Sequence, residues 1–179
     1  MLQQIDNAVL HFFGSVQTPI LNELMIFISA LGNAGLIWIA VSIIMLCFKR
    51  TRRSGATMAV ALIIGLVVCN ITLKPLIART RPFDAHDIEL LIATPTGFSF
   101  PSGHSVSSLG AGMSAFLTLK KRGIPFLLLA ILIAVSRLYL QVHYLSDVLA
   151  GSLLGCIFAV AANLIVNRKS GHISKAKEV

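Results

Sequence analysis

The stretch SRLYLQVHYLSD, residues 136–147, joins two hydrophobic segments and decides how the rest of the chain is interpreted. It places Arg137, His143 and Asp147 at the mouth of those segments. His143 and Asp147 are four residues apart, so on a helix their side chains share a face and can meet. A carboxylate fixes the tautomer of a neutral imidazole and increases its nucleophilicity, and the guanidinium of Arg137 suits phosphate. The alternative is a His–Asp hydrogen bond that only tightens a loop.

The composition is that of a membrane protein. Of the 179 residues, 56% are hydrophobic and 12% are charged, and the mean hydropathy is +0.85. A soluble domain has about twice that charged fraction. The sequence therefore predicts an all-α fold, a polytopic transmembrane helical bundle, with residues 1–179 forming a single membrane-embedded domain.

Five hydrophobic runs are each near the roughly 20 residues that cross a bilayer. They cover approximately residues 30–48, 55–73, 102–119, 124–140 and 145–166. Residues 1–29 contain two shorter amphipathic segments, which we expect to lie at the membrane interface as helices. This region is also a candidate for a sixth core helix. Residues 168–179 are expected to form a basic, disordered, cytoplasmic tail.

The basic residues predict the orientation of the bundle. Five crossings place residues 49–53, 120–122 and 168–177 on one side, with eleven of the fifteen Lys and Arg residues. The positive-inside rule makes that side cytoplasmic. The net charge of +8 and pI near 9.9 then reflect topology, and no nucleic-acid partner is expected. The remaining four basic residues lie on the outer side at span ends, where charges are usually functional: Lys74, Arg79, Arg81 and Arg137.

A second polar cluster is Lys74-Pro-Leu-Ile-Ala-Arg-Thr-Arg81-Pro82. Lys74 and Arg81 are seven residues apart, so on a continuous helix they would point the same way. Pro75 and Pro82 disfavour such a helix at both ends. The alternative is a juxtamembrane anchor whose cations extend to the lipid headgroups.

A third cluster, Pro101-Ser102-Gly103-His104, opens the third hydrophobic run. Ser102 is a good N-cap, and Gly103 allows close approach of a ligand to the backbone. The unsatisfied N–H groups and dipole of a helix N-terminus favour an anion, which His104 would face. An ordinary cap with an incidental histidine is the alternative.

The three clusters share one membrane depth in the predicted topology. Phosphoryl transfer needs what they supply together: donors for the phosphate oxygens, an in-line nucleophile and an acid at the leaving oxygen. Asp147 also begins a face that continues through Gly151 and Gly155, a spacing that we attribute to close helix packing.

Taken in chain order, Lys74 to Pro82, Pro101 to His104 and Ser136 to Asp147, the three clusters resemble the three-part signature of the type 2 phosphatidic acid phosphatase family of membrane lipid phosphate phosphatases. The resemblance covers the second to the fifth predicted span. It implies that His143 attacks phosphorus and forms a phosphohistidine, and that Asp147 orients His143. His104 would protonate the leaving group and then activate water.

The resemblance also implies a phosphate-binding set, an absence of metal and other cofactors, and a substrate class. The phosphate-binding residues would be Lys74, Arg81, Ser102, Gly103 and Arg137. Arg79 falls outside the family pattern and is interpreted as a surface charge. Many family members have six spans, which makes the five predicted here a departure. Residues 83–100 are interpreted either as a lid over the site or as a solvated loop.

The predicted protein is a metal-independent phosphatase of a bacterial inner membrane, with its active site on the outer, periplasmic side and its C-terminus in the cytoplasm. Its partners would be membrane lipids and a lipid phosphate substrate, foremost undecaprenyl diphosphate, because an outward site suits carrier-lipid recycling in cell-wall synthesis. Phosphatidylglycerol phosphate and phosphatidic acid are alternative substrates. Two other classes stay open, a non-catalytic phospholipid-binding or transport protein and an oxidant of the haloperoxidase type.

Overall fold

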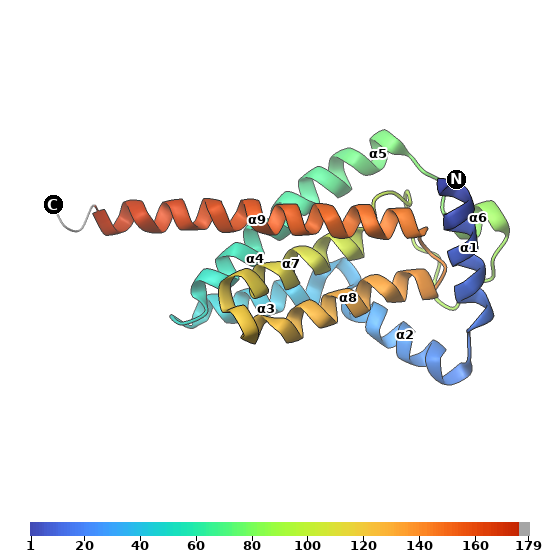
Figure 1. Ribbon diagram of the computed structural model, residues 1–179, viewed down its shortest axis with the longest axis horizontal. Helices are drawn as coiled ribbons and strands as arrows, with labels where there is room; N and C mark the ends of the chain where they lie inside the picture. The colour runs from blue at the N-terminus through green and yellow to red at the C-terminus, as the bar shows by residue number, and fades with distance from the viewer. Residues whose placement is uncertain (176–179) are drawn as a thin grey trace.

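The structure, a computed structural model, describes the backbone of residues 1–175 and the side chains of residues 1–168. All regular structure in this part of the chain is helical, which confirms the all-α prediction (Figure 1). The elements are α1 (Leu2–Ser15), α2 (Pro19–Leu31), η1 (Asn33–Gly35), α3 (Leu36–Cys47), α4 (Arg52–Gly65), η2 (Leu66–Leu73), α5 (Lys74–Ile77), α6 (Pro82–His86), α7 (Gly103–Leu119), η3 (Lys120–Gly123), α8 (Ile124–Tyr139) and α9 (Leu145–Lys175).

Helix α7 lies at the centre of the bundle and packs against α9, α8 and α4. Its contact with α9 is close because α9 presents glycines: a Cβ at Gly151 would lie 2.7 Å from the carbonyl oxygen of Ser102, and one at Gly155 2.6 Å from that of Val106. The predicted packing role of this glycine face is confirmed. In a membrane, where apolar burial gives little drive between helices, such backbone contact is a main source of association.

Three continuous stretches are long and apolar enough to cross a membrane, residues 52–86, 103–139 and 145–168. A fourth is added if α2 and α3, which are bent by 41° relative to each other, count as one broken span. Residues 103–139 consist of the antiparallel helices α7 and α8, joined by η3 (Figure 1). The first span was predicted to start near residue 30, which lies inside α2. The helix instead breaks a few residues later, at Ala34 and Gly35, which have positive φ.

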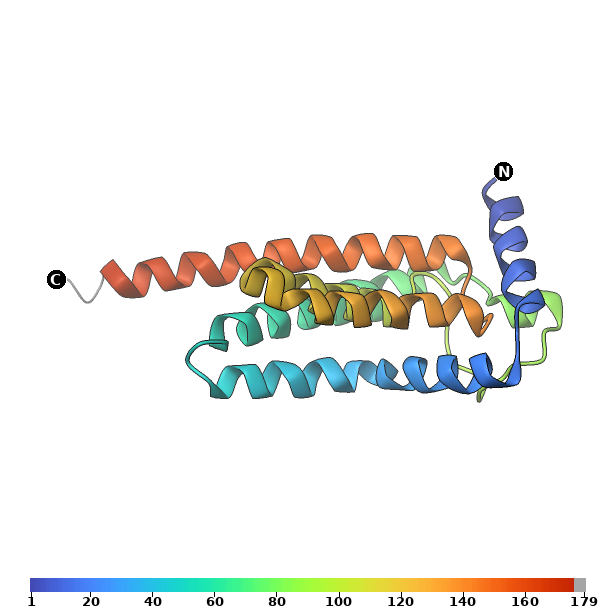
Figure 2. The ribbon, with the colours of Figure 1, turned by 60° about the horizontal axis from the view of Figure 1, so that its bottom comes forward.

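Helix α1 lies across the end of the bundle opposite the C-terminus (Figure 2). It contacts α8 and α9, and it buries only Asp6 and Leu10. The N-terminal region therefore closes one end of the bundle, the end at which the three sequence clusters meet.

Two further differences from the predicted elements affect the site and the tail. The second hydrophobic run ends as a π-helix, η2, a wide-turn form that is frequent at functional sites. The chain leaves α5 through Ala78 at φ +49°, so no continuous helix joins Lys74 to Arg81. Helix α9 continues to Lys175, so the predicted disordered tail begins as helix, and its residues 176–179 lie outside the described part.

Candidate active site

His143 and Asp147 meet as predicted, but across the start of a helix rather than along its face. His143 lies in the loop after α8, and Asp147 lies in the first turn of α9. The Asp147 carboxylate folds back, so that its Oδ2 accepts a hydrogen bond from the Tyr144 N–H at 2.9 Å and lies 3.5 Å from His143 Nδ1. Both side chains are buried, His143 with 2% of its surface exposed. The carboxylate thus acts as part of the helix N-cap and as the neighbour of the imidazole.

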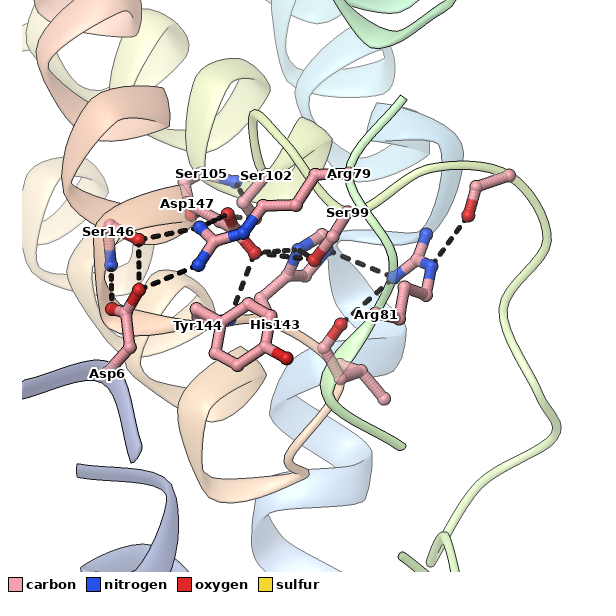
Figure 3. Close-up of polar contacts among 12 residues, drawn as sticks. Asp6, Arg79, Arg81, Ser99, Ser102, Ser105, His143, Tyr144, Ser146 and Asp147 are labelled. Carbon is pink, nitrogen blue, oxygen red and sulfur yellow. Dashed lines mark hydrogen bonds and ion pairs between the residues drawn. The ribbon is translucent and has the colours of Figure 1, made fainter. Parts of the chain in front are cut away.

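Two further side chains hold the same carboxylate more closely than His143 does. The Ser99 hydroxyl donates to Asp147 Oδ2 at 2.5 Å, and Arg79 Nη1 donates to Oδ1 at 2.5 Å (Figure 3). Ser99 Oγ also lies 3.4 Å from His143 Nδ1. Ser99 was not among the predicted site residues, since nothing in its spacing from Asp147 marks a partner 48 positions away.

The interpretation of Arg79 as a surface charge is wrong. Its side chain is 22% exposed and extends between two carboxylates, bonded to Asp147 and, through Nη2 at 2.8 Å, to Asp6 on α1. Its guanidinium also lies over the Tyr144 ring, 4.1 Å from the centroid. A lone aspartate in an amphipathic helix was the available signal, but sequence spacing does not pair Asp6 with a residue 73 positions later.

Arg81 lies beside the nucleophile candidate, with its Nη1 3.4 Å from His143 Nε2. A guanidinium has only donors, so this contact suits an unprotonated Nε2 and a proton on Nδ1. The other Arg81 donors bind the carbonyl oxygens of Thr96, Gly97 and Val142 at 2.8–3.1 Å. Arg81 therefore lies next to Nε2 and also anchors the segment before α7 through the carbonyl oxygens of Thr96 and Gly97.

Lys74 and the start of α7 face each other. A Cβ at Gly103 would lie 3.6 Å from Lys74 Nζ and 3.2 Å from Asn70 Oδ1. The N-cap prediction for Ser102 is confirmed, because its Oγ accepts a hydrogen bond from the Ser105 N–H at 3.4 Å. The Ser105 hydroxyl also donates to this oxygen at 2.9 Å. A phosphate contact from Ser102 stays a prediction.

His104 and Arg137 line a cavity of about 320 Å³ together with Ser29 and Asn33. His104 Nε2 lies 3.1 Å from Asn33 Oδ1, and Arg137 Nη1 donates to Ser29 Oγ. Among the described residues, the buried Nε of Arg137 has no hydrogen-bond partner. An unsatisfied buried donor costs free energy unless a ligand or water accepts from it, and an anion in this cavity would supply an acceptor.

A larger groove of about 560 Å³ runs from this region along α3 and α4. Its walls come mainly from apolar side chains of α3 and α4, including Ile39, Ile43 and Ile63. Its polar lining includes Asn70, Lys74 and His104, and His104 lines both cavities. The groove therefore connects an apolar wall with three of the predicted site residues, Lys74, Gly103 and His104.

The segment between the first two clusters is packed rather than freely solvated. Leu90, Leu91 and Ile92 contact the buried cluster that contains Tyr139 and Val142. Further along, this segment supplies the carbonyl contacts to Arg81 and the Ser99 hydroxyl. The segment therefore covers one side of the site with these residues, while others, such as Asp87 and Glu89, are exposed.

The environment of His143 favours its neutral form. Burial lowers the pKa of the imidazole from 6.5 to about 4; the Asp147 hydrogen bond opposes that shift, and the charges of Arg137 and Arg81 add to it. Near neutral pH the ring is therefore unprotonated at one nitrogen, as a nucleophile requires.

The geometry brings all predicted site residues to one end of the bundle. Comparison with known proteins finds similarity to membrane phosphatases. The PAP2 superfamily model matches residues 54–170. The chain is 38% identical over 141 residues to an undecaprenyl-diphosphatase of Sulfolobus acidocaldarius (78% of this chain, 68% of the relative). It is 31% identical over 170 residues to phosphatidylglycerophosphatase B of Bacillus subtilis (87% and 80%). The fold is similar to a crystal structure of a Bacillus subtilis PAP2-type phosphatidylglycerolphosphate phosphatase, with TM-score 0.76, 28% identity and coverage of 93% and 86%.

Proposed function

The chain belongs to the PAP2 superfamily, and from that membership we propose that it is an integral membrane phosphatase with a histidine nucleophile and no metal requirement, which hydrolyses a lipid-linked phosphate or diphosphate. The observation that carries the proposal is the position of His143, whose Nε2 faces Arg81 while Nδ1 faces Asp147. This is the orientation that an attacking imidazole needs. The apolar groove that ends at Lys74 and His104 supports a lipid as the carrier of the phosphate.

The reaction has two steps in this proposal. His143 Nε2 bonds to phosphorus as the bond to the leaving oxygen breaks, and the electron pair stays on that oxygen, which takes a proton from His104. Neutral His104 then accepts a proton from water, whose oxygen attacks phosphorus and releases phosphate from His143.

The phosphate oxygens would be held by cations and backbone donors throughout both steps. Lys74, Arg81 and Arg137 supply the charges. Ser102 and the Gly103 N–H supply donors at the start of α7, where the helix dipole favours an anion.

Undecaprenyl diphosphate is the first-ranked substrate, and the Sulfolobus relative named undecaprenyl-diphosphatase supports it. The second candidate is phosphatidylglycerol phosphate, which the Bacillus relative and the solved structure support by name. Phosphatidic acid is the third. In each case the tail would lie in the groove between α3 and α4, with the phosphate at its polar end.

The proposed topology has five crossings in a bacterial inner membrane. They are the bent pair α2–α3, then α4 with η2, then α7, α8 and α9, with α1 at the outer interface. The active site then faces the periplasm and the C-terminus the cytoplasm, as the basic residues predict.

The test is a phosphate-release assay on purified protein in detergent, with undecaprenyl diphosphate, phosphatidylglycerol phosphate and phosphatidic acid supplied separately. Release from at least one lipid, abolished in His143→Ala, supports the proposal. A wild type that binds these lipids without releasing phosphate would instead support a non-catalytic protein. Vanadate should inhibit release, whereas a gain of halide oxidation with vanadate and peroxide would indicate a haloperoxidase.

A further inference from the structure

Asp6 is a buried carboxylate on a mostly exposed helix. It is 1% exposed, and α1 buries only one other residue, Leu10. Burying a carboxylate is costly unless it is paired. Asp6 is fully paired: Oδ1 accepts from the Ser146 N–H at 2.9 Å, and Oδ2 accepts from the Ser146 hydroxyl at 2.6 Å and from Arg79 Nη2 at 2.8 Å. Asp6 thus reaches from α1 to the first turn of α9.

Arg79 connects Asp6 to the carboxylate beside the nucleophile. Nη2 binds Asp6, and Nη1 binds both Asp147 Oδ1 at 2.5 Å and the Ser146 hydroxyl at 2.7 Å (Figure 3). The ring of Tyr144 lies against the guanidinium. The position of Arg79, and through it the orientation of Asp147, therefore depends on a residue of the N-terminal helix.

The charges of this group also matter. Two carboxylates and one guanidinium leave a net charge of −1, which faces His143. If Asp6 were neutral, Arg79 would cancel the charge of Asp147. A neutral pair stabilises a nearby cation less than a net negative group does.

We propose that Asp6 is a positioning residue for phosphoryl transfer, which acts through Arg79 to keep Asp147 oriented and net negative toward His143. The inference rests on the proposed phosphohistidine mechanism. When Nε2 bonds to phosphorus, the proton on Nδ1 stays in place and the imidazole becomes cationic. The Asp6–Arg79–Asp147 group stabilises that cation. Asp6 lies outside residues 54–170, the part matched by the superfamily model, so the N-terminal helix adds a part of its own to the site.

The first test compares kcat and KM of Asp6→Asn with those of the wild type, per folded molecule, using the lipid that the wild type hydrolyses. We expect kcat to fall about tenfold and KM to stay within about twofold, because Asp6 does not touch the phosphate. Asp6→Glu, which keeps the charge, should recover part of kcat. Gln4→Ala, an exposed change on the same helix, is the matched control and should leave both constants unchanged.

The second test adds Arg79→Gln alone and in combination with Asp6→Asn. The net charge of the group is −1 in the wild type, 0 in Asp6→Asn, −2 in Arg79→Gln and −1 again in the double variant. If charge carries the effect, the double variant, with a net charge of −1, should have a higher kcat than Asp6→Asn, with a net charge of 0. A merely structural tie predicts the opposite, because the double variant loses both partners.

The outcomes separate this inference from the proposed function. Two outcomes would overturn the role of Asp6 and leave the proposed function standing, provided that the wild type is active. In one, Asp6→Asn keeps the full kcat. In the other, the double variant is no faster than Asp6→Asn. A folded wild type that releases phosphate from none of the lipids would overturn the proposed function and this inference together.

Discussion

Asp147 makes its shortest contacts with Ser99 and Arg79, at 2.5 Å each, and a longer one with His143, at 3.5 Å. The carboxylate is therefore fixed by groups that do not change charge during the proposed reaction. A preorganised carboxylate stabilises an emerging imidazolium without the cost of reorienting during the step. The role of His143 and Asp147 as a pair thus depends on two residues from other segments, Arg79 and Ser99, that hold the carboxylate.

His104 is the residue whose role depends most on the leaving group. Replacing His104 with Ala should lower kcat on a lipid phosphate by about a hundredfold or more, because an alkoxide or phosphate leaving group needs a proton. On a nitrophenyl phosphate, whose leaving group is a good one, the loss should be smaller. The measurement is the ratio of the two losses. Equal losses on both substrates would contradict the assignment of His104 as the acid.

The pH dependence should report the unusual pKa of His143. With that pKa lowered to about 4, the neutral, nucleophilic form persists as pH falls through 6.5, and it is lost only near the lower value. The acid limb of kcat/KM should therefore lie well below 6.5. Arg137→Gln removes a positive charge that lowers this pKa. The acid limb of the residual kcat/KM of this variant should therefore move to higher pH.

Measuring the wild type and Arg137→Gln on the same substrate separates ionisation of the protein from ionisation of the substrate. Ionisation of the phosphate itself is the same in both assays, so a shift of the limb between variants belongs to the protein. A wild-type limb at the ordinary histidine value, unmoved in Arg137→Gln, would contradict the proposed environment of His143.

At the scale of elements, the groove between α3 and α4 makes a prediction about tails. Ile63 lines the groove from α4, and Ile63→Trp would fill part of it. We expect turnover of a long-chain lipid phosphate to fall at least several-fold while turnover of a soluble nitrophenyl phosphate stays near the wild-type value, since a bulky ring competes only with the tail. Leu164→Trp, an exposed apolar position on α9 that does not line the groove, is the matched control. Equal turnover of the long-chain lipid in both variants would place the tail elsewhere.

Helix ends were predictable where local chemistry marks them. The run predicted at 102–119 corresponds to α7, which begins after the Ser102 cap, and the run at 124–140 corresponds to α8 after the basic turn. The break at Ala34 and Gly35 lies among Gly32, Asn33 and Gly35, which mark a loosened start of the first span without fixing where the helix bends. The π-helical η2 was not predictable, because no residue in its mainly apolar sequence marks a change of helix type. A hydrophobic pattern specifies that a segment is buried or faces lipid, and it does not specify where packing bends the helix.

The candidate site divides in the same way. His143 and Asp147 are close in sequence, so their contact was predictable even though the helix argument for it was wrong. Arg79 and Asp6 are joined by a salt bridge between segments 73 positions apart, and only the folded chain brings them together. Their pairing depends on how α1 closes the end of the bundle, which no local spacing encodes.

At the scale of the whole molecule, the site sits at one end of the bundle because three different elements are held there. The glycine face of α9 packs closely against α7, so Asp147 at the start of α9 stays next to the start of α7: the Ser102 N–H donates to the Asp147 carbonyl oxygen at 3.1 Å. The turn after α5 adds Arg79 and Arg81. The proposed chemistry therefore depends on the stacking of helices as much as on the side chains themselves.

The orientation of the bundle decides which leaflet supplies the substrate, and cysteine labelling tests it. In a variant without the native cysteines, Glu89→Cys lies in the segment next to the site and Lys121→Cys in the basic turn after α7; both native side chains are exposed. A membrane-impermeant maleimide added to intact cells, with access through any outer membrane, should label position 89 and leave position 121 unlabelled. Permeabilising the inner membrane should then expose position 121, because the positive-inside rule keeps the basic turn in the cytoplasm. Labelling in the opposite order would place His143 on the cytoplasmic side, and the substrate would have to be a lipid phosphate of the inner leaflet.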